Sequence, residues 1–302
     1  MTAPLTLVVL AAGLGSRYGG LKQLDPLGPG GATLMDYAVF DAWRAGFSRA
    51  VFVIRPEMAA AFGETMGNRY RSRLEVATAH QRLDALPTGY PVPPGRTRPW
   101  GTTQAVLAAA AEIRGPFAVL NADDFYGRRS LQAVADFLRA GSAESAHHAV
   151  VGYRLDATAS PAGGVNRALL ERGPDGHLTR ITELRELIRA ADGNFIAGAE
   201  ASGRRVEAGA LVSMNLWGFS ATILPVLVRA FEDFLRAGPG ERGECYLPDA
   251  VQAAMVRGDA TVEVLPTADR WCGVTYAEDR AWVVAALRAL VDDGSYPESM
   301  WS

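Results

Sequence analysis

The sequence predicts an α/β fold with a mostly parallel central sheet and an antiparallel or mixed extension. In the first half of the chain, short apolar runs alternate with helix-like segments, and glycine or proline closes most of these segments. From residue 148 to residue 217, strand-like runs dominate. Strands that alternate with helices are typical of βαβ units and therefore of a parallel sheet. The first half thus predicts the sheet, and the middle of the chain predicts its extension.

The composition is typical of a globular cytoplasmic protein. The chain has 302 residues, of which 49% are hydrophobic and 21% are charged, and no linker divides it, so we interpret residues 1–302 as a single domain. The net charge of −3 predicts no general attraction to nucleic acid or anionic membranes, and no apolar stretch is long enough to span a bilayer. Two cysteines are too few for a disulfide scaffold.

Six elements are predicted in the first half of the chain. Residues 5–11 are a continuous apolar run closed by glycine, which predicts a strand buried on both faces. Residues 33–45 predict a helix that Thr33 caps, with Asp36 three positions later and Gly46 as its stop. The other four are a strand at residues 50–54, a helix at 102–114, a strand at 117–120 and a capped helix at 130–140.

The second half begins with strands and ends with helices. Strands are expected at residues 149–153, 167–171, 178–181 and 211–219, and amphipathic helices at 223–237 and 276–291. Pro174, Asp175 and Gly176 predict a hairpin turn between the second and third of these strands. Residues 87–99 contain five prolines and predict a loop, for which a lid over the site is the candidate role.

A glycine-rich loop follows the first predicted strand. Residues 10–22 read L-A-A-G-L-G-S-R-Y-G-G-L-K, with four glycines and two cations, Arg17 and Lys22. Glycine lets the backbone approach a ligand and present N–H groups to anionic oxygens, and fixed positive charge stabilises phosphate. Ligands bind at the carboxyl ends of parallel strands. The loop therefore predicts a phosphate-binding site, in preference to a tight turn with solvated basic residues.

Two common phosphate-binding loops can be tested against this spacing. A P-loop requires glycine, lysine and then serine or threonine, whereas here Leu21 precedes Lys22 and Gln23 follows it. A dinucleotide loop requires G-x-G-x-x-G and an acidic residue after the second strand. Here Tyr18 takes the place of the third glycine, and Arg55 follows the second strand. The P-loop is excluded, and an NADP-binding oxidoreductase that uses Arg55 stays as an alternative.

Residues 10–17, with Lys22 a few residues on, resemble the signature L-A-A-G-x-G-[ST]-R of the sugar-1-phosphate nucleotidyltransferases. The resemblance implies a Rossmann-like (GT-A-like) nucleotidyltransferase fold, with a nucleotide-binding half at 1–147 and an acceptor-binding half at 148–302. It implies transfer of a nucleoside monophosphate from a nucleoside triphosphate to a sugar 1-phosphate, which releases pyrophosphate and gives a nucleotide sugar. Arg17 and Lys22 would be catalytic. The nucleotide would be held at Leu10, Ala11, Ala12, Gly13, Gly15 and Ser16.

Two aspartates follow the third predicted strand, in the segment N-A-D-D-F-Y-G at residues 121–127. Carboxylates at a strand end are oxygen ligands suited to Mg²⁺, although Asn and Asp are also common in ordinary turns. The segment is similar to the family's G-D-N element, whose aspartate binds magnesium. The resemblance therefore assigns Asp123 as the catalytic metal ligand and Asp124 as a second choice.

The segment W-C-G-V-T-Y-A-E-D at residues 271–279 resembles the family's W-x-D-x-G-T-P-x-D, in which the first aspartate is the second magnesium ligand. Gly273 stands at that position in this chain. Asp269, two residues before Trp271, is the candidate substitute. The resemblance thus implies Mg²⁺ as the cofactor, with Asp269 as a further candidate ligand.

The segment W-G-T-T-Q-A at residues 100–105 resembles the family's G-x-x-Q-A element, in which a glycine-containing helix start lies against the nucleobase. The resemblance implies nucleotide contacts from Gly101, Thr102 and Gln104. Gln81 lies in a segment that matches the family's base-contacting glutamine, and we expect it on the same side of the site.

The strand–turn–strand at residues 167–183 resembles a family element that ends in Glu-Lys, where glutamate contacts the sugar hydroxyls and lysine contacts its phosphate. Glu183 matches the glutamate, but Leu184 stands in the place of the lysine. Arg185 or Arg180 is the candidate source of the missing charge.

Residues 214–219 resemble the strand that follows in the family, which makes Asn215 a candidate contact to the acceptor. The phosphate of such an acceptor has its second pKa near roughly 6, so it is an anion at neutral pH and needs no general base. Catalysis can then rest on positioning and charge neutralisation.

The implied partners are a nucleoside triphosphate and a sugar 1-phosphate, and the resemblance leaves a homo-oligomer open. Besides the oxidoreductase, two alternatives remain. One is a related transferase that acts on a non-sugar phosphate, such as choline phosphate. The other is a nucleotide- or sugar-nucleotide-sensing protein without catalysis, to which Gly273 points.

Overall fold

The computed structural model of the chain describes residues 4–13, 25–141, 145–198 and 203–301. The strands are β1 (Thr6–Leu10), β2 (Arg49–Ile54), β3 (Glu75–His80), β4 (Phe117–Asn121), β5 (Asp124–Phe125), β6 (His147–Arg154), β7 (Val165–Arg172), β8 (Leu178–Arg189), β9 (Phe195–Ile196), β10 (Arg205–Val206), β11 (Leu211–Phe219), β12 (Thr261–Pro266) and β13 (Cys272–Gly273). The α-helices are α1 (Leu34–Arg44), α2 (Ala59–Phe62), α3 (Thr102–Ala108), α4 (Arg128–Ala140), α5 (Ile223–Arg236), α6 (Leu247–Arg257) and α7 (Asp279–Asp292).

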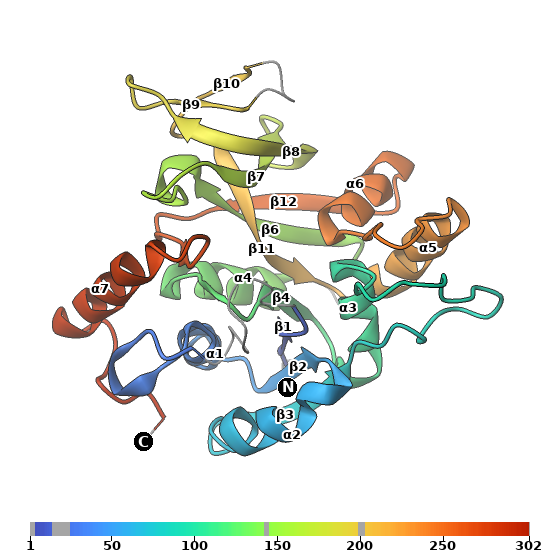
Figure 1. Cartoon of the computed structure of the whole chain (residues 1–302), viewed down its shortest axis with the longest axis horizontal. Coiled ribbons are helices and arrows are strands. Elements are labelled where there is room, and N and C mark those ends of the chain that lie inside the picture. Colours follow the sequence, from blue (N-terminus) through green and yellow to red (C-terminus); the bar gives the residue numbers. More distant parts are fainter. Residues whose placement is uncertain (1–3, 14–24, 142–144, 199–202, 302) are drawn as a thin grey trace.

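Most of the strands join one 11-stranded sheet, which confirms the predicted α/β fold (Figure 1). Its order is β10-β9-β8-β7-β11-β4-β1-β2-β3, with β6 beside β11 and β12 beside β6. The strands β3, β2, β1 and β4 are parallel, and β11 pairs antiparallel with β4. β7, β8, β9 and β10 continue as antiparallel neighbours. The predicted extension is therefore the antiparallel side of the same sheet.

Helices cover both faces of the sheet because the buried strands are apolar on both sides. Along β1, Leu7 and Val9 pack with α1 and α4, while Val8 between them packs with α3, α5 and α6. All three side chains are fully buried. This burial explains the continuous apolar run, since a strand covered on both faces does not alternate with polar residues. No helix in the described ranges is long and apolar enough to cross a membrane.

The capping box predicted for the first helix is present. The Thr33 hydroxyl accepts a hydrogen bond from the Asp36 N–H at 3.2 Å, and the Asp36 carboxylate accepts one from the Thr33 N–H at 2.8 Å. Gly46 follows the helix with a φ of 89°, a conformation that a side chain would strain. Both ends of α1 are therefore set by its local sequence.

Two predicted helices have other bounds in the structure. α4 begins at Arg128 rather than at Ser130, so Ser130 lies inside its first turn and does not cap it. α3 ends at Ala108, six residues before the predicted end, and a short 3-10 turn follows it. The predicted hairpin turn is confirmed, since the Gly173 N–H donates to the His177 carbonyl at 2.8 Å.

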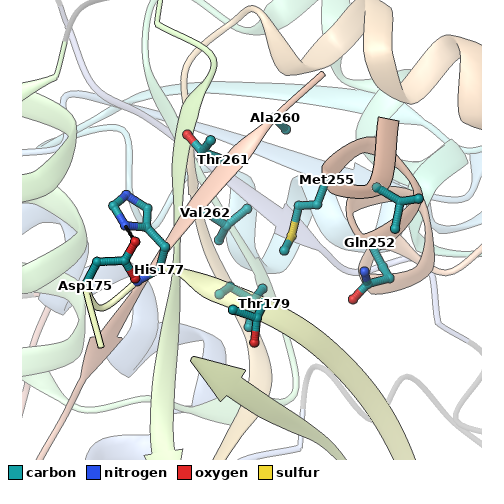
Figure 2. A pocket seen from close by; sticks show the side chains of 10 residues that line it. Asp175, His177, Thr179, Gln252, Met255, Ala260, Thr261 and Val262 are labelled. Atoms are coloured by element: carbon teal, nitrogen blue, oxygen red, sulfur yellow. Dashed lines mark hydrogen bonds and ion pairs between the residues drawn. The ribbon is translucent and has the colours of Figure 1, made fainter. Parts of the chain in front are cut away.

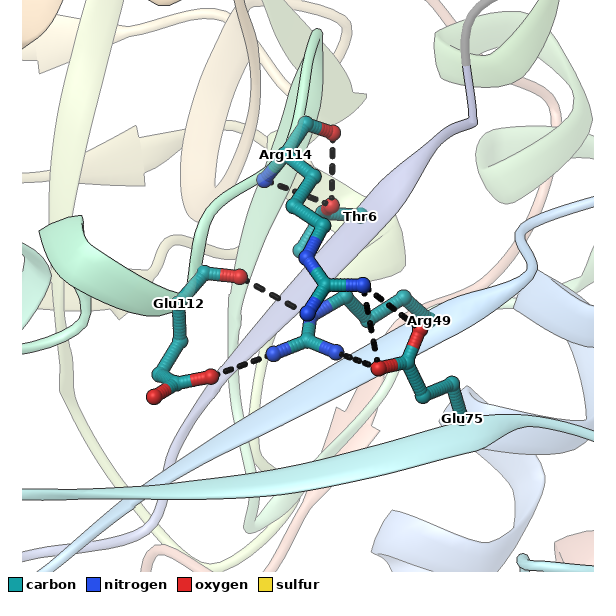
Figure 3. A network of polar contacts seen from close by, with 5 residues as sticks. All are labelled: Thr6, Arg49, Glu75, Glu112 and Arg114. Carbon is teal, nitrogen blue, oxygen red and sulfur yellow. Dashed lines mark hydrogen bonds and ion pairs between the residues drawn. The ribbon is translucent and has the colours of Figure 1, made fainter.

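A buried arginine joins the amino ends of the parallel strands, at the edge opposite their carboxyl ends (Figure 3). Arg49 is almost fully buried and forms ion pairs with Glu75 at the start of β3 and with Glu112. Arg114 pairs with Glu75 at 3.2 Å, and its carbonyl accepts a hydrogen bond from Thr6 of β1 at 2.9 Å. These contacts hold the amino ends of the parallel strands together, which leaves the carboxyl ends of the strands for a site.

Candidate active site

The carboxyl ends of β1, β2 and β4 form the floor of the candidate site. Leu10, the last residue of β1, stands in register with the last residue of β4. Its carbonyl accepts a hydrogen bond from the Ala122 N–H at 3.1 Å, and the Ala11 N–H donates to Val53 of β2 at 2.8 Å. The glycine-rich loop therefore leaves the sheet beside the turn that carries Asp123.

The described part of this loop ends at Gly13. Ala11 and Ala12 are buried, so their backbone lies against the sheet rather than in solvent. Four predicted residues of the loop lie outside the described residues, namely Gly15, Ser16, Arg17 and Lys22. Their roles stay predictions, as do those of Leu10, Ala11, Ala12 and Gly13 in binding the nucleotide.

Asp124 is held in place by groups around the end of β4. Its Oδ2 accepts hydrogen bonds from Asn121 at 3.0 Å and from the Tyr126 hydroxyl at 3.2 Å. Burial and the nearby Asp124 carboxylate raise the pKa of Tyr126, so its hydroxyl stays protonated. Asp124 is only 8% exposed, whereas Asp123 is half-buried. Of the two aspartates, Asp123 is the more accessible to a ligand.

Asn215 reaches the same turn from β11. Its side chain donates to Asn121 at 2.7 Å and accepts from the Trp217 indole at 2.9 Å. Its φ of 62° lies within an irregularity of β11 that separates the pairing of Ser213 from that of Trp217. Strained backbone of this kind is costly and is common at functional sites. The structure thus brings Asn215 to the site, and it adds Asn121, to which the sequence interpretation assigned no role.

The predicted nucleobase residues meet on the other side of the floor. Gln81, at the end of β3, donates to the Gly101 carbonyl at 3.0 Å and to the Gln104 side chain at 2.9 Å. Gly101 has a φ of 99°, and a Cβ there would lie 2.5 Å from the Cys245 carbonyl oxygen. Only glycine fits this position. The structure brings Gln81, Gly101 and Gln104 together, and their contact with a nucleotide stays a prediction.

Thr102 belongs to this group by position, but its hydroxyl points elsewhere. The hydroxyl accepts a hydrogen bond from the Leu247 N–H at 2.8 Å, at the start of α6. Thr102 therefore joins α3 to α6, and a direct nucleotide contact stays a prediction.

The proline-rich loop is anchored beside Gly101. Arg96 is 5% exposed, and its guanidinium donates to the carbonyls of Gly240 at 2.8 Å and Gly243 at 2.7 Å. The same guanidinium lies 3.5 Å from the centre of the Trp100 ring. Arg96 thus ties one end of the loop to the segment before α6, and the lid role stays a prediction.

Glu183 and Arg185 are exposed on β8, on the antiparallel side of the sheet. Partial desolvation and Asp249 of α6 raise the pKa of Glu183, while Arg167 and Arg185 oppose the rise. Glu183 therefore lies near cations from two neighbouring positions. Its predicted contact with an acceptor, and that of Arg185, stay predictions.

Arg167 of β7 is a buried cation that the sequence interpretation did not assign. Its guanidinium donates to the Thr158 hydroxyl at 3.2 Å and to the Asn166 carbonyl at 2.8 Å, and it also bonds the Thr158 carbonyl. The guanidinium carbon lies 4.8 Å from the centre of the Trp271 ring. These contacts hold the charge in one orientation, because arginine stacks on aromatic rings and keeps its planar geometry.

Three carboxylates act on this buried cation. Burial lowers the pKa of Arg167 to about 10, and Asp124, Glu183 and Asp279 oppose the change. A pKa of about 10 keeps the guanidinium protonated at neutral pH. Arg167 therefore places a fixed positive charge between the turn at the end of β4 and the antiparallel side of the sheet.

The family model described as "Nucleotidyl transferase" matches residues 6–274, which is most of the chain. The chain belongs to this family. Among solved structures, a UDP-glucose pyrophosphorylase complexed with UDP-glucose is similar, with a TM-score of 0.59 and 15% identity over 94% of this chain and 98% of that chain. The inositol-1-phosphate CTP transferase from T. maritima has a TM-score of 0.60 and 14% identity over 95% and 97%. No match is found among curated proteins.

The magnesium site that the family resemblance implies can be tested at Gly273. Gly273 stands opposite Asp124 in the short β5–β13 ladder. A Cβ at Gly273 would lie 2.7 Å from Cζ2 of Trp271 and 3.0 Å from Oδ1 of Asp124. The indole therefore occupies the space that a second carboxylate would need. The described residues contain no group of three or more His, Cys, Asp or Glu side chains that could hold a metal.

Asp269 has the contacts of a helix cap. Its Oδ2 accepts hydrogen bonds from the Ser130 N–H at 2.9 Å and from the Ser130 hydroxyl at 3.2 Å, in the first turn of α4. A Cβ at Gly127 would lie 2.6 Å from its carboxyl carbon, so Asp269 packs closely against the helix start. The structure shows Asp269 as a helix cap, and the metal-binding roles of Asp123, Asp124 and Asp269 stay predictions.

A separate cavity of about 500 Å³ lies between the β7–β8 hairpin, β12 and α6 (Figure 2). Asp175 Oδ2 and His177 Nδ1 lie 3.2 Å apart on one side of it, and Gln252 and Met255 of α6 lie on the other. No residue that the sequence assigned to the site lines this cavity. It is a distinct feature of the antiparallel side of the sheet.

Proposed function

We propose that this protein transfers a nucleoside monophosphate from a nucleoside triphosphate to a sugar 1-phosphate, with release of pyrophosphate. One observation carries the proposal. In a member of the nucleotidyl transferase family, the signature loop after β1 leaves the sheet beside the Asp123 turn, and Asn215 reaches that turn from the acceptor side. Loop, carboxylate and acceptor strand thus meet at the carboxyl ends of the parallel strands, where such sheets bind ligands.

In the proposed reaction, one side of the floor binds the nucleoside triphosphate and the other side binds the acceptor. The triphosphate lies along the glycine-rich loop, with its base toward Gln81 and Gly101, and the acceptor lies toward Asn215 and Glu183. The acceptor phosphate oxygen attacks the α-phosphorus in line with the leaving pyrophosphate. Because this oxygen is already an anion near pH 7, the protein needs to align the two substrates and stabilise the developing charge rather than remove a proton.

Lys22 is the only lysine in the sequence, and every other basic side chain is an arginine. Lysine presents a compact, strongly hydrated point charge, whereas arginine presents a planar fork of donors. The single lysine of the chain lies in the signature loop. This position favours a role for which the ammonium group is required. This supports Lys22 as a contact to the triphosphate.

The proposal is tested by measuring pyrophosphate release with each of four nucleoside triphosphates and a panel of acceptors. The panel holds several sugar 1-phosphates, myo-inositol 1-phosphate and phosphocholine. The second and third classes are included because one structural neighbour is an inositol-1-phosphate CTP transferase and because Leu184 takes the place of the expected lysine. Release with a sugar 1-phosphate supports the proposal, and release only with another acceptor replaces the substrate class.

Lys22→Ala and Asp123→Ala are each expected to lower turnover at least about 100-fold, because Lys22 neutralises phosphate charge directly and Asp123 is the predicted ligand of the metal ion that does so. Lys22→Arg is expected to restore little of the loss. Asp136→Ala, a change at an exposed aspartate of α4, serves as the control and should keep normal turnover. Normal turnover of Lys22→Ala or Asp123→Ala would contradict the catalytic role assigned to that residue.

The single lysine also allows a binding test that does not need turnover. Acetic anhydride modifies amines, and Lys22 supplies the only side-chain amine of the chain. A bound nucleoside triphosphate is expected to protect Lys22 from acetylation, as read by peptide mass spectrometry, while the N-terminal amine reacts as before. If the triphosphate protects Lys22 but releases no pyrophosphate in the presence of any acceptor, the protein is a sensing protein instead of an enzyme.

A further inference from the structure

The strand pairing places Arg167 directly opposite Leu184. In the antiparallel β7–β8 ladder, Arg167 is the cross-strand partner of Leu184, and Ala168 is the partner of Glu183. Directly opposed residues project from the same face of a sheet, with Cβ atoms roughly 4.5–5.5 Å apart. The position next to Glu183 that lacks a cation is therefore faced by a cation on the neighbouring strand.

Burial supports the same placement. Leu184 is 3% exposed and belongs to the core cluster that also contains Trp271, the ring on which Arg167 stacks. Arg167 is itself 7% exposed. Both side chains thus lie under the surface on one face of the antiparallel side of the sheet.

The other candidate cations are placed differently. Arg180 and Arg185 are both exposed on β8. Arg180 stands opposite Glu171, near the start of the strand and away from the pair that contains Leu184. Arg167 is the buried cation that the ladder brings to this position.

Arg167 keeps capacity for an anion. Among the described residues, its hydrogen bonds to Thr158 and Asn166 use three of its five N–H groups, one on each nitrogen. A second N–H remains on each terminal nitrogen, and charge-assisted hydrogen bonds from arginine to phosphate are strong. The Thr158 contacts and the Trp271 ring hold the guanidinium rigid, which lowers the entropy lost on binding.

We infer that Arg167 binds the phosphate of the acceptor substrate, in place of a cation at position 184. The inference rests on the proposed function and names the group that positions the attacking oxygen. The acceptor is then a phosphate monoester whose phosphate lies between Arg167 and the Asp123 turn. The cation then stands on β7 instead of on the neighbouring strand β8, at the position directly opposite Leu184.

The test uses Arg167→Met, which keeps an apolar chain over Trp271 but removes the charge. It is expected to raise the KM for the acceptor phosphate at least about 10-fold and to leave the KM for the nucleoside triphosphate within about twofold, because a charge-assisted hydrogen bond is lost on the acceptor side only. Arg172→Met, at an exposed position of the same strand, is the matched control and should change neither value.

The double variant Arg167→Met with Leu184→Lys returns one cation to the same cross-strand pair. It is expected to recover most of the acceptor KM, a result that loss of a structural contact with Thr158 would not give. If Arg167→Met alone does not fold, the double variant and Arg167→Lys are compared by the same two KM values.

The outcomes separate this inference from the proposed function. Wild-type turnover with an unchanged acceptor KM in Arg167→Met overturns the role of Arg167 and leaves the function standing. A folded double variant that does not recover the acceptor KM also overturns the role of Arg167 and leaves the function standing. Absence of pyrophosphate release from the wild-type protein with every acceptor overturns both.

Discussion

At the scale of single residues, Gly273 decides which groups surround Asp124. A side chain here would collide with the Trp271 ring, and that ring supports the guanidinium of Arg167. The absence of a side chain at Gly273 therefore leaves space for the Trp271 ring, and the ring in turn packs against the Arg167 guanidinium. A carboxylate at position 273 would add a negative charge where this chain has an aromatic ring backed by a cation.

Gly273→Asp is expected to destabilise the protein by about 1–3 kcal/mol, because the new Cβ must displace Trp271 within a packed core. It is also expected to lower activity rather than create a better metal site. Urea unfolding measures the first effect, and a magnesium titration of turnover measures the second. Gly63→Asp is the control, since a Cβ at Gly63 meets nothing within 4 Å.

A Gly273→Asp variant that is as stable as the wild type and requires less magnesium would contradict this view. It would mean that the ring moves aside at little cost and that a two-carboxylate site forms once the second aspartate is supplied.

The residues that the sequence identified differ from those it missed in one respect. Asp123 and the glycine-rich loop follow buried strands directly, so their place at the site is readable from strand ends alone. Arg167 matters because it faces Leu184, and Asn121 matters because Asn215 bonds to it. Such pairings depend on which strands become neighbours, and a single sequence does not contain that information.

At the scale of elements, α4 shows a helix whose cap comes from a distant part of the chain. Its first two residues are Arg128 and Arg129, and its first turn contains no acidic residue, so its own sequence opposes the helix dipole. Asp269, far along the chain, supplies the missing acceptor and negative charge at Ser130. The sequence therefore placed the start of this helix at the wrong residue.

Asp269→Ala is expected to lower the free energy of unfolding by about 1–2 kcal/mol, because the Ser130 N–H loses its partner and the helix loses a favourable charge. Asp269→Asn should lower it less, since it keeps an acceptor. Chemical denaturation measures both. An increased magnesium requirement in Asp269→Ala with unchanged stability would instead identify Asp269 as a metal ligand.

The elements that the sequence predicted share a strong local signal, and those it missed lack one. β1, β2 and β4 are continuous apolar runs, as expected for strands covered on both faces. β3 is an edge strand with mixed burial, so its pattern is weak. β8 runs to Arg189, eight residues beyond the predicted end. Its second part buries Leu184 and Leu187 at a spacing of three residues, so it lacks the alternation of a half-buried strand.

At the scale of the whole molecule, a buried carboxyl group joins the last segment of the chain to α1. Asp41 is 1% exposed, and its Oδ2 accepts a hydrogen bond from the Tyr296 hydroxyl at 2.6 Å. Burial raises the pKa of Asp41 to about 7, although the hydrogen bond from Tyr296 and the charge of Arg44 lower it. Asp41 therefore changes protonation in the folded protein within the neutral range.

The sign of the effect on stability follows from this raised pKa. Between the ordinary Asp value near 3.8 and about 7, the folded state binds the proton that the unfolded state has lost, so stability falls as pH rises through this window. The contribution is complete below about pH 4 and absent well above pH 7. Its upper limit is about 4 kcal/mol for a shift of about three units.

Asp41→Asn is expected to remove this fall, so that the variant gains stability relative to the wild type as pH increases from 4 to 8. Tyr296→Phe is the informative second variant, because loss of the hydrogen bond raises the Asp41 pKa further and moves the fall to higher pH. Urea unfolding at several pH values measures both. Parallel pH profiles for wild type and Asp41→Asn would show that Asp41 does not titrate in this range.

β11 restricts how the molecule can move around its substrates. Residues Trp217–Phe219 of this strand pair with β4 in the parallel half, and Val212 and Ser213 pair with β7 on the acceptor side. Opening the two predicted halves about a hinge would break these ladders together with the Asn215–Asn121 bond. We therefore expect the sheet to behave as one rigid body during turnover. Access is then expected to be controlled by segments outside the ladders, for which the proline-rich loop, anchored at Arg96, is the candidate.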